Sequence, residues 1–255
     1  MKPLILVTND DGITSKGIRT LVDVMKLLGE VIVVAPNSPQ SGMGHAITIG
    51  EPLRLYSTHI FEDVVEYECS GTPADCVKIA KHYVLLDRRP DLVVSGINHG
   101  SNNSINVLYS GTMSAAIEGA IEGIPAIGFS LCDFREDADF SHSIPFIKSI
   151  TEAALENGIP NGIALNVNIP AKADLPIRGV KICRQAHAKW QEKFDYRVDP
   201  NGRGYLWMAG EFVNFDTEKE DTDVWALDNN YVSVVPCQYD LTGYEAVKTL
   251  STWDL

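Results

Sequence analysis

The chain has 255 residues, enough for one large domain with a sizeable core, and its 45 % hydrophobic and 22 % charged residues are ordinary for a globular protein. Its 34 acidic and 21 basic residues give a net charge of −13. This charge argues against binding of nucleic-acid polymers, because such binding depends on Lys and Arg that neutralise phosphates. The negative charge is still compatible with a small phosphorylated ligand where a cation or oriented backbone amides offset the repulsion between the protein and the phosphate.

The cysteines are odd in number and form no C-x-x-C pair; they are Cys69, Cys76, Cys132, Cys183 and Cys237. We therefore expect reduced, mostly buried thiols in a cytoplasmic protein, and no thiolate metal site. The first apolar run is too short for a signal peptide, and carboxylates follow it at once. Because no run of about 18 apolar residues exists, we expect neither a transmembrane helix nor a membrane partner.

Short apolar runs alternate with amphipathic stretches over the first 170 residues. In chain order the pattern predicts a strand at Leu4–Thr8, a helix at Ser15–Leu28, a strand at Val31–Ala35, a helix at Pro73–Leu85, a strand at Leu92–Ser95, a helix at Thr112–Glu122, a strand at Ala126–Leu131, a helix at Ser143–Asn157 and a strand at Ala164–Ile169. The second helix has the clearest start, with Thr72 as N-cap and Asp75 three residues later. Alternation of this kind predicts a parallel sheet covered by helices, an α/β fold.

The pattern changes after Pro170. Aromatic residues cluster there among glycines and charges; they are Trp190, Tyr196, Tyr205, Trp207, Phe212 and Phe215. This composition predicts hairpins with exposed aromatic surface, and exposed apolar patches mark interfaces. A helix-like stretch at Asp221–Ala226 and a strand at Tyr231–Val235 return to the earlier pattern. We therefore expect one domain over 1–255, with an α/β core (1–185), an oligomerisation extension (186–218) and a return to the core with a C-terminal tail (219–255).

Ligands bind at the carboxyl ends of the strands in parallel α/β sheets, so the residues that follow each predicted strand matter most. Asp10 and Asp11 follow the first strand. Two adjacent carboxylates repel each other unless a cation lies between them, and Mg²⁺ or Mn²⁺ suits them. An alternative, equally weighted from this segment alone, is that Asp10 is a turn residue and Asp11 a cap.

The loop after the second strand is polar and contains glycine. Ser41 offers a neutral oxygen to a metal, whereas His45 is more typical of a surface or neighbouring residue than of a ligand. An ordinary surface connection is the alternative for this loop.

Amides follow the strand at Leu92–Ser95. Asn98 offers a carbonyl oxygen for a hard metal or an amide donor for an anion. The segment Ser110-Gly111-Thr112 then opens a helix, where free N–H groups and the helix dipole favour phosphate. A simple cap by Ser110 or Thr112 is the alternative. Taken together, these residues place carboxylates, a hydroxyl, amides and an anion-binding helix start at one sheet edge, which favours metal-assisted phosphoryl transfer to water.

The chain resembles the SurE family, a family of 5′-nucleotidases. The strings that carry this resemblance run in order from residue 4 to residue 236; they are LVTNDDGITSKGI, APNSPQSGMGHAIT, CSGTPADCVK, DLVVSGINHGSNN, YSGTMSAAIEG, NVNIP and DTDVWALDNNYVSVVP. The set is highly specific, although no single string is.

The resemblance implies a Rossmann-like three-layer α/β/α sandwich with a C-terminal β-hairpin extension exchanged between subunits of a homodimer or homotetramer. It implies one divalent Mg or Mn ion per subunit, held by Asp10, Asp11, Ser41 and Asn98. It also implies that Asn102 and the segment Ser110-Gly111-Thr112 face the phosphate. The implied substrates are nucleoside 5′-monophosphates, with 3′-monophosphates and short polyphosphate as further substrates.

One departure from the family pattern lies after Asn102, where a glycine-containing stretch is replaced by residues 103–108. This departure bears on base preference and not on the metal site. Two competing functions remain. One is a phosphatase that forms an aspartyl-phosphate, although such enzymes need Asp-x-Asp and not adjacent acids. The other is a nucleotide-binding module without activity, which would gain nothing from two carboxylates next to a phosphate.

Overall fold

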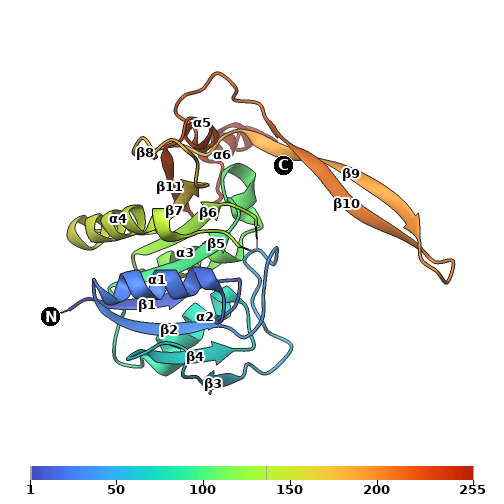
Figure 1. Ribbon diagram of the computed structural model, residues 1–255. Coiled ribbons are helices and arrows are strands. Elements are labelled where there is room, and N and C mark those ends of the chain that lie inside the picture. The colour runs from blue at the N-terminus through green and yellow to red at the C-terminus, as the bar shows by residue number, and fades with distance from the viewer. Residues whose placement is uncertain (1, 136, 255) are drawn as a thin grey trace.

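The computed structural model describes residues 2–135 and 137–254. A nine-stranded sheet with helices on both faces forms the body, and a two-stranded hairpin projects from it (Figure 1). The strands are β1 (Leu4–Thr8), β2 (Glu30–Pro36), β3 (Leu55–Ser57), β4 (Val65–Cys69), β5 (Leu92–His99), β6 (Ala126–Cys132), β7 (Ile163–Pro170), β8 (Val180–Ile182), β9 (Ala188–Val198), β10 (Gly204–Asn214) and β11 (Val232–Gln238). The α-helices are α1 (Lys16–Lys26), α2 (Pro73–Ile79), α3 (Gly111–Ile121), α4 (Ile144–Asn157), α5 (Asp223–Asp228) and α6 (Tyr244–Leu250). Among the described residues, every helix is too short or too polar to cross a membrane.

The strands of the large sheet follow the order β3-β4-β2-β1-β5-β6-β7-β11-β8. The six strands from β4 to β7 in this order are parallel. At one edge β3 is antiparallel to β4, and towards the other edge β11 is antiparallel to β7. The predicted parallel sheet is therefore confirmed for its five predicted strands, β1, β2, β5, β6 and β7; β4 is a sixth parallel strand that was not predicted, and the sheet is not parallel at its two margins.

Connection length accounts for the direction of β8, which runs opposite to β7. Only nine residues, 171–179, separate β7 from β8. A parallel neighbour needs a crossover of a dozen or more residues, which this loop cannot supply. Strand β11 pairs in parallel with β8 and antiparallel with β7, so the predicted strand at Tyr231–Val235 is present but runs in the opposite direction to the central strands.

Each face of the sheet has its own apolar core. Alternate residues of β1 point to opposite faces, so Ile5 packs in one core and Leu6 in the other. Helices α1 and α4 contribute to the core of Ile5, whereas α2 and α3 contribute to that of Leu6. All five cysteines are free thiols.

The predicted helices are confirmed with shifted ends. In α2 the capping box is present, because Thr72 Oγ1 accepts from the backbone N–H of Asp75 and the Asp75 carboxylate accepts from that of Thr72. This helix ends at Ile79 and continues as a π-helical turn over Ala80–Val84. Strands β3, β4 and β8 and helix α6 were not predicted. In β4, Glu66 is buried and accepts hydrogen bonds from the preceding loop, which hides the strand from a hydrophobicity pattern.

Strands β9 and β10 form the hairpin, with paired residues from Ala188 opposite Asn214 to Val198 opposite Gly204. They lie within the predicted extension and confirm that it is a hairpin. Most side chains of both strands are exposed, including Phe194 and Trp207. Figure 1 shows the hairpin pointing away from the body. A role in oligomerisation stays a prediction.

Candidate active site

The carboxyl ends of β1, β2 and β5 and the start of α3 meet at one cavity of about 420 Å³. Five of the eight predicted site residues line this cavity; they are Asp10, Ser41, Asn98, Asn102 and Ser110. The other three are Asp11, which follows Asp10 in the chain, and Gly111 and Thr112, which follow Ser110. The segments that carry these residues are far apart in the chain, and the parallel topology brings them together.

Asp10 is the most buried acid of the site, with 4 % of its surface exposed. The Thr112 hydroxyl donates a hydrogen bond to Asp10 Oδ1. A Cβ atom at Gly111 would lie 2.6 Å from Asp10 Cβ and 2.9 Å from Asp10 Oδ2. The start of α3 is therefore packed against the Asp10 carboxylate, and only a glycine at position 111 leaves room for that carboxylate.

The pKa of Asp10 is raised from 3.8 to about 6, chiefly by burial and also by the charge of Asp11, against the lowering effect of the Thr112 hydrogen bond. The protein alone thus holds this carboxylate at a cost, because a buried charge without a partner of opposite sign is unfavourable. A cation beside Asp10 and Asp11 would offset that cost.

Asn98 lies where the register between β5 and β6 shifts, between Ser95 and Asn98. A bulge of this kind turns a side chain out of the regular pleat. The Asn98 amide donates to the backbone oxygens of His99 at 3.1 Å and Gly100 at 2.8 Å. Because both contacts use Nδ2, they orient Oδ1 as the atom that remains for a ligand.

Asp11 lies next to His99. The Asp11 Oδ2 atom is 3.3 Å from the His99 backbone nitrogen and 3.4 Å from His99 Nδ1. The His99 ring lines the cavity and packs edge-on against Phe140, with ring centroids 4.9 Å apart. Sequence reasoning assigned no role to His99; its position in a strand end rich in amides was the available signal.

Asn102 is fixed by a buried network from β6 and β7. Its backbone N–H donates to Asn168 Oδ1 and its backbone oxygen accepts from Asn166 Nδ2, both at 2.7 Å. Its side-chain Nδ2 donates to Ser130 Oγ at 2.8 Å, and Asn168 Nδ2 donates to Asn166 Oδ1 at 2.9 Å. Sequence reasoning assigned no role to Asn166 and Asn168, although two amides in an otherwise apolar strand were a usable signal.

Ser110 is both a cap and a lining residue. Its Oγ accepts from the Met113 backbone N–H at 3.0 Å, which confirms the capping alternative for this residue, and its side chain also borders the cavity. His45 does not line this cavity, and its Nε2 lies 2.9 Å from Glu118 Oε2. Its side chain therefore contacts helix α3 and not the site, in agreement with the expectation that it is not a ligand.

Aromatic rings close the cavity on the side of the hairpin. Trp190 of β9 and Phe212 of β10 line it together with Tyr109 and Phe134. Trp190 and Phe212 were predicted only as part of an exposed aromatic surface. The structure places these two at the site, while other hairpin aromatics such as Trp207 lie outside the cavity.

The donor set fits a hard divalent cation. Of the lining residues, Asp10 would supply a carboxylate, Ser41 a hydroxyl and Asn98 an amide oxygen, and the adjacent Asp11 would add a second carboxylate. Oxygen ligands of these kinds suit Mg²⁺ or Mn²⁺. Within residues 2–135 and 137–254, no three His, Cys, Asp or Glu side chains gather in a way that could hold a metal. The site is therefore unlike the Cys- and His-rich sites typical of zinc.

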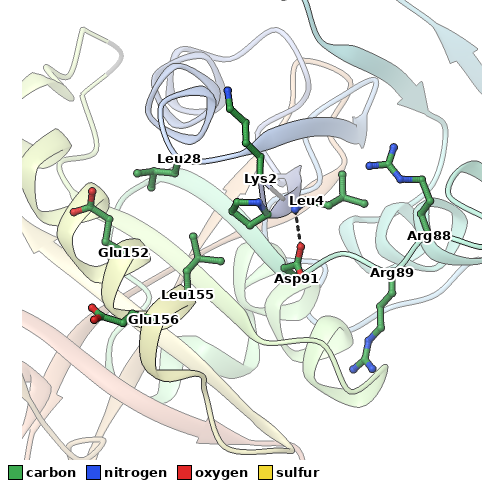
Figure 2. A pocket seen from close by; sticks show the side chains of 10 residues that line it. Lys2, Leu4, Leu28, Arg88, Arg89, Asp91, Glu152, Leu155 and Glu156 are labelled. Carbon is green, nitrogen blue, oxygen red and sulfur yellow. Dashed lines mark hydrogen bonds between the residues drawn. The ribbon is translucent and has the colours of Figure 1, made fainter.

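A cavity of about 730 Å³ lies at the opposite edge of the sheet, where β1, β2 and β5 begin (Figure 2). The Leu4 backbone N–H donates to Asp91 Oδ2 at 2.7 Å there. Arg88 is paired with Glu30, and Leu28 lies opposite on the α1 side. Because ligands of parallel sheets bind at the carboxyl edge, we assign the chemistry to the smaller cavity.

The family described as "Survival protein SurE" matches residues 5–192 of this chain. A protein of Cytophaga hutchinsonii described as 5′-nucleotidase SurE is 68 % identical over 98 % of this chain and 96 % of its own length. A protein of Christiangramia forsetii with the same description is 63 % identical over 100 % of this chain and 98 % of its own. The crystal structure of the SurE protein from Aquifex aeolicus has a TM-score of 0.83 at 42 % identity and covers 98 % of both chains.

Asp10→Asn should stabilise the metal-free protein near pH 7 and abolish its response to a divalent cation. The folded-state pKa of Asp10 lies above its ordinary value, so the wild-type stability falls as the pH rises from about 4 to about 6 and then loses no more through this group. We expect the variant to gain about 1–3 kcal/mol in free energy of unfolding in EDTA near pH 7. Urea denaturation with and without Mn²⁺ measures both effects.

Asp23→Asn on the exposed side of α1 is the matched control and should change stability by less than about 0.5 kcal/mol. A variant at Asp10 that is less stable than wild type, or that is still stabilised by Mn²⁺ to the same extent, would contradict the assignment.

Proposed function

This chain belongs to the SurE family, and from that membership and the geometry of its site we propose that it is a 5′-nucleotidase, which hydrolyses nucleoside monophosphates to nucleoside and phosphate. The observation that carries the proposal is the meeting of Asp10, Ser41 and Asn98 at one cavity on the carboxyl edge of the sheet. Nucleoside 3′-monophosphates and short polyphosphates present the same phosphoryl group and are included as substrates.

We infer one divalent Mg or Mn ion per subunit, held by Asp10, Asp11, Ser41 and Asn98. Two supports come from the chain itself: burial raises the pKa of Asp10, and the contacts of Asn98 leave its Oδ1 for a ligand. When bound, such an ion supplies Lewis-acid screening of the phosphate charge and makes a water molecule more acidic.

The remaining predicted residues orient the phosphate or its neighbours. Asn102 and Ser110 line the cavity and are held by other hydrogen bonds, so they are prepared to contact phosphate oxygens. Gly111 and Thr112 lie against Asp10, and the first-turn amides of α3 add the positive end of the helix dipole. Gly111 and Thr112 would therefore act on the phosphate from a position that their contacts with Asp10 fix.

We propose that water attacks phosphorus directly. Asp10 and Asp11 would hold the cation, and Asp10 also accepts from Thr112, so neither carboxylate would be well placed as a nucleophile. Asp10 is the preferred acceptor for the proton of the attacking water, because of the two acids it is the one that lines the cavity. The adjacent acids disfavour an aspartyl-phosphate, and a binding module without activity would not need them.

The chain as a whole is proposed to form one domain, with a Rossmann-like core, the hairpin extension and a C-terminal return. The five free thiols support a cytoplasmic location, which fractionation of cells would test. The acidic net charge supports small nucleotides, and not nucleic-acid polymers, as substrates.

Phosphate release from AMP and GMP with Mn²⁺ is the direct test of this function, and Asp11→Asn tests the site. Loss of one charged ligand should cost at least about 2 kcal/mol of transition-state stabilisation, a decrease in turnover of about 30-fold or more. EDTA should stop the wild-type reaction without unfolding the protein. Asp23→Asn should keep full activity, while turnover of Asp11→Asn within twofold of wild type at saturating Mn²⁺ would end the assignment.

Direct attack by water predicts that no phosphoenzyme forms. After rapid acid quench of a single turnover with ³²P-labelled AMP, we expect label only in free phosphate and in unreacted substrate. Label on precipitated wild-type protein that is lost in Asp10→Asn would show covalent catalysis instead.

We propose that the outer part of the hairpin joins subunits into a homodimer or homotetramer. An isolated two-stranded hairpin is marginally stable, and this one exposes Phe194, Leu206 and Trp207 on its outer part. Replacement of residues 193–209 by an Asn-Gly turn joins Glu192 to its paired residue Gly210 and keeps the cavity wall. We expect a smaller particle by light scattering with an unchanged far-UV signal for the core. A full-length monomer at micromolar concentration, or a variant of unchanged mass per particle, would refute this role.

A further inference from the structure

The site cavity has two chemically different ends. Asp10, Ser41, Asn98 and Ser110 form a polar end that suits a cation and a phosphate. The other end is an aromatic wall, defined here as Trp190 and Phe212 from the hairpin with Tyr109 from the body. Phosphoryl transfer needs no aromatic ring, so the chemistry of the polar end does not account for the wall.

The wall is a built structure. Trp190 and Phe212 are paired across the two strands, and their rings meet edge to face with centroids 5.6 Å apart. The Trp190 indole N–H donates to Asn106 Oδ1 at 2.8 Å, which ties the hairpin to the 3₁₀ turn Ser104–Leu108. The indole is thus held at both edges, although 40 % of its surface stays exposed.

A tryptophan held in this way presents a fixed apolar surface to the cavity. Its only hydrogen-bond donor is already used by Asn106, so it offers ring area and no polar contact to a ligand. Stacking of this kind accepts any nucleobase, because every base has a π-face. The cavity volume of about 420 Å³ lies within the range of small-molecule sites.

We propose that the nucleobase of the substrate stacks on Trp190 while its phosphate lies at the polar end of the same cavity. This inference rests on the proposed nucleotidase function and extends it to a residue that selects nucleotides over other phosphomonoesters. Phe212 and Tyr109 border the base, and Asn106 is a positioning residue for the indole. Because ring area decides the contact, purine nucleotides are preferred over pyrimidine nucleotides.

The test compares AMP with ribose 5-phosphate, which has the same phosphate and sugar but no base. Trp190→Ala should lower kcat/KM for AMP by about 5- to 150-fold, the range found for loss of one base stack. The value for ribose 5-phosphate should stay within twofold of wild type. Trp190→Phe, which keeps a ring, should recover most of the activity on AMP.

Trp207→Ala is the matched control, because Trp207 lies in the same hairpin outside the cavity. It should leave the ratio of the two substrates unchanged. Equal losses on both substrates in Trp190→Ala would show that the wall only supports the site or the subunit assembly, and would overturn the proposal. A wild-type enzyme that hydrolyses both substrates equally well would also overturn it, while leaving the phosphatase function intact.

A second measurement does not need activity. The chain contains four tryptophans, and titration with adenosine in EDTA should give a saturable change in fluorescence in wild type and in Trp207→Phe. The change should be absent in Trp190→Phe. A missing signal in wild type, or the same signal in Trp190→Phe, would reject base stacking even if the enzyme proves inactive on every phosphomonoester.

Discussion

The placement of the buried Asp10 carboxylate constrains the rest of the site. Asp10 leaves β1 at the centre of the sheet, and α3 packs so closely on it that a side chain at Gly111 would overlap the carboxylate. The Thr112 hydroxyl and the positive end of the α3 dipole lower the cost of this burial, yet the pKa of Asp10 remains raised to about 6. The folded protein therefore stores part of the unfavourable energy of a desolvated charge next to Asp11. A divalent cation bound there, as proposed, would relieve that energy, so metal binding and substrate chemistry would share one origin in the packing of α3 on β1.

The two asparagines of the proposed site are positioned by contacts that use their other polar atoms. The Asn98 amide nitrogen is bound by backbone oxygens, so only its Oδ1 remains. Asn102 is anchored at its backbone through Asn166 and Asn168, which lie on the far side of the sheet's centre in β7. Such anchoring lowers the entropy that would be lost on binding a ligand, because the side chains are already ordered. The site is rigid on the side of the sheet and is completed by a hairpin on the other.

The sequence was sufficient for five of the parallel strands, for helices α1 to α5 and for the edge of the sheet at which the site lies, because buried parallel strands give long apolar runs and ligands gather at their carboxyl ends. It was not sufficient for the outer strands, since β3 and β8 have three residues each and the parallel strand β4 buries Glu66. It also missed His99, whose contact with Asp11 depends on the fold of a strand end. The sequence showed that Trp190 belongs to an aromatic cluster but not where it lies. An aromatic residue in a hairpin is equally compatible with an interface and with a ligand wall, and its place in the cavity lining, fixed by the hydrogen bond to Asn106, favours the ligand wall.

The hairpin joins two properties that are usually carried by separate segments. Its base lies against the 3₁₀ turn and supplies Trp190 and Phe212 to the cavity, whereas its outer part exposes apolar side chains such as Trp207 away from the body. The two parts belong to one ribbon, whose residues are paired from Ala188 to Val198 without a break. They use different side chains of that ribbon, because Trp190 and Phe212 line the cavity while Trp207 lies outside it. The proposed assembly through the outer part and the proposed base contact at the aromatic wall are therefore separable by substitution within one hairpin.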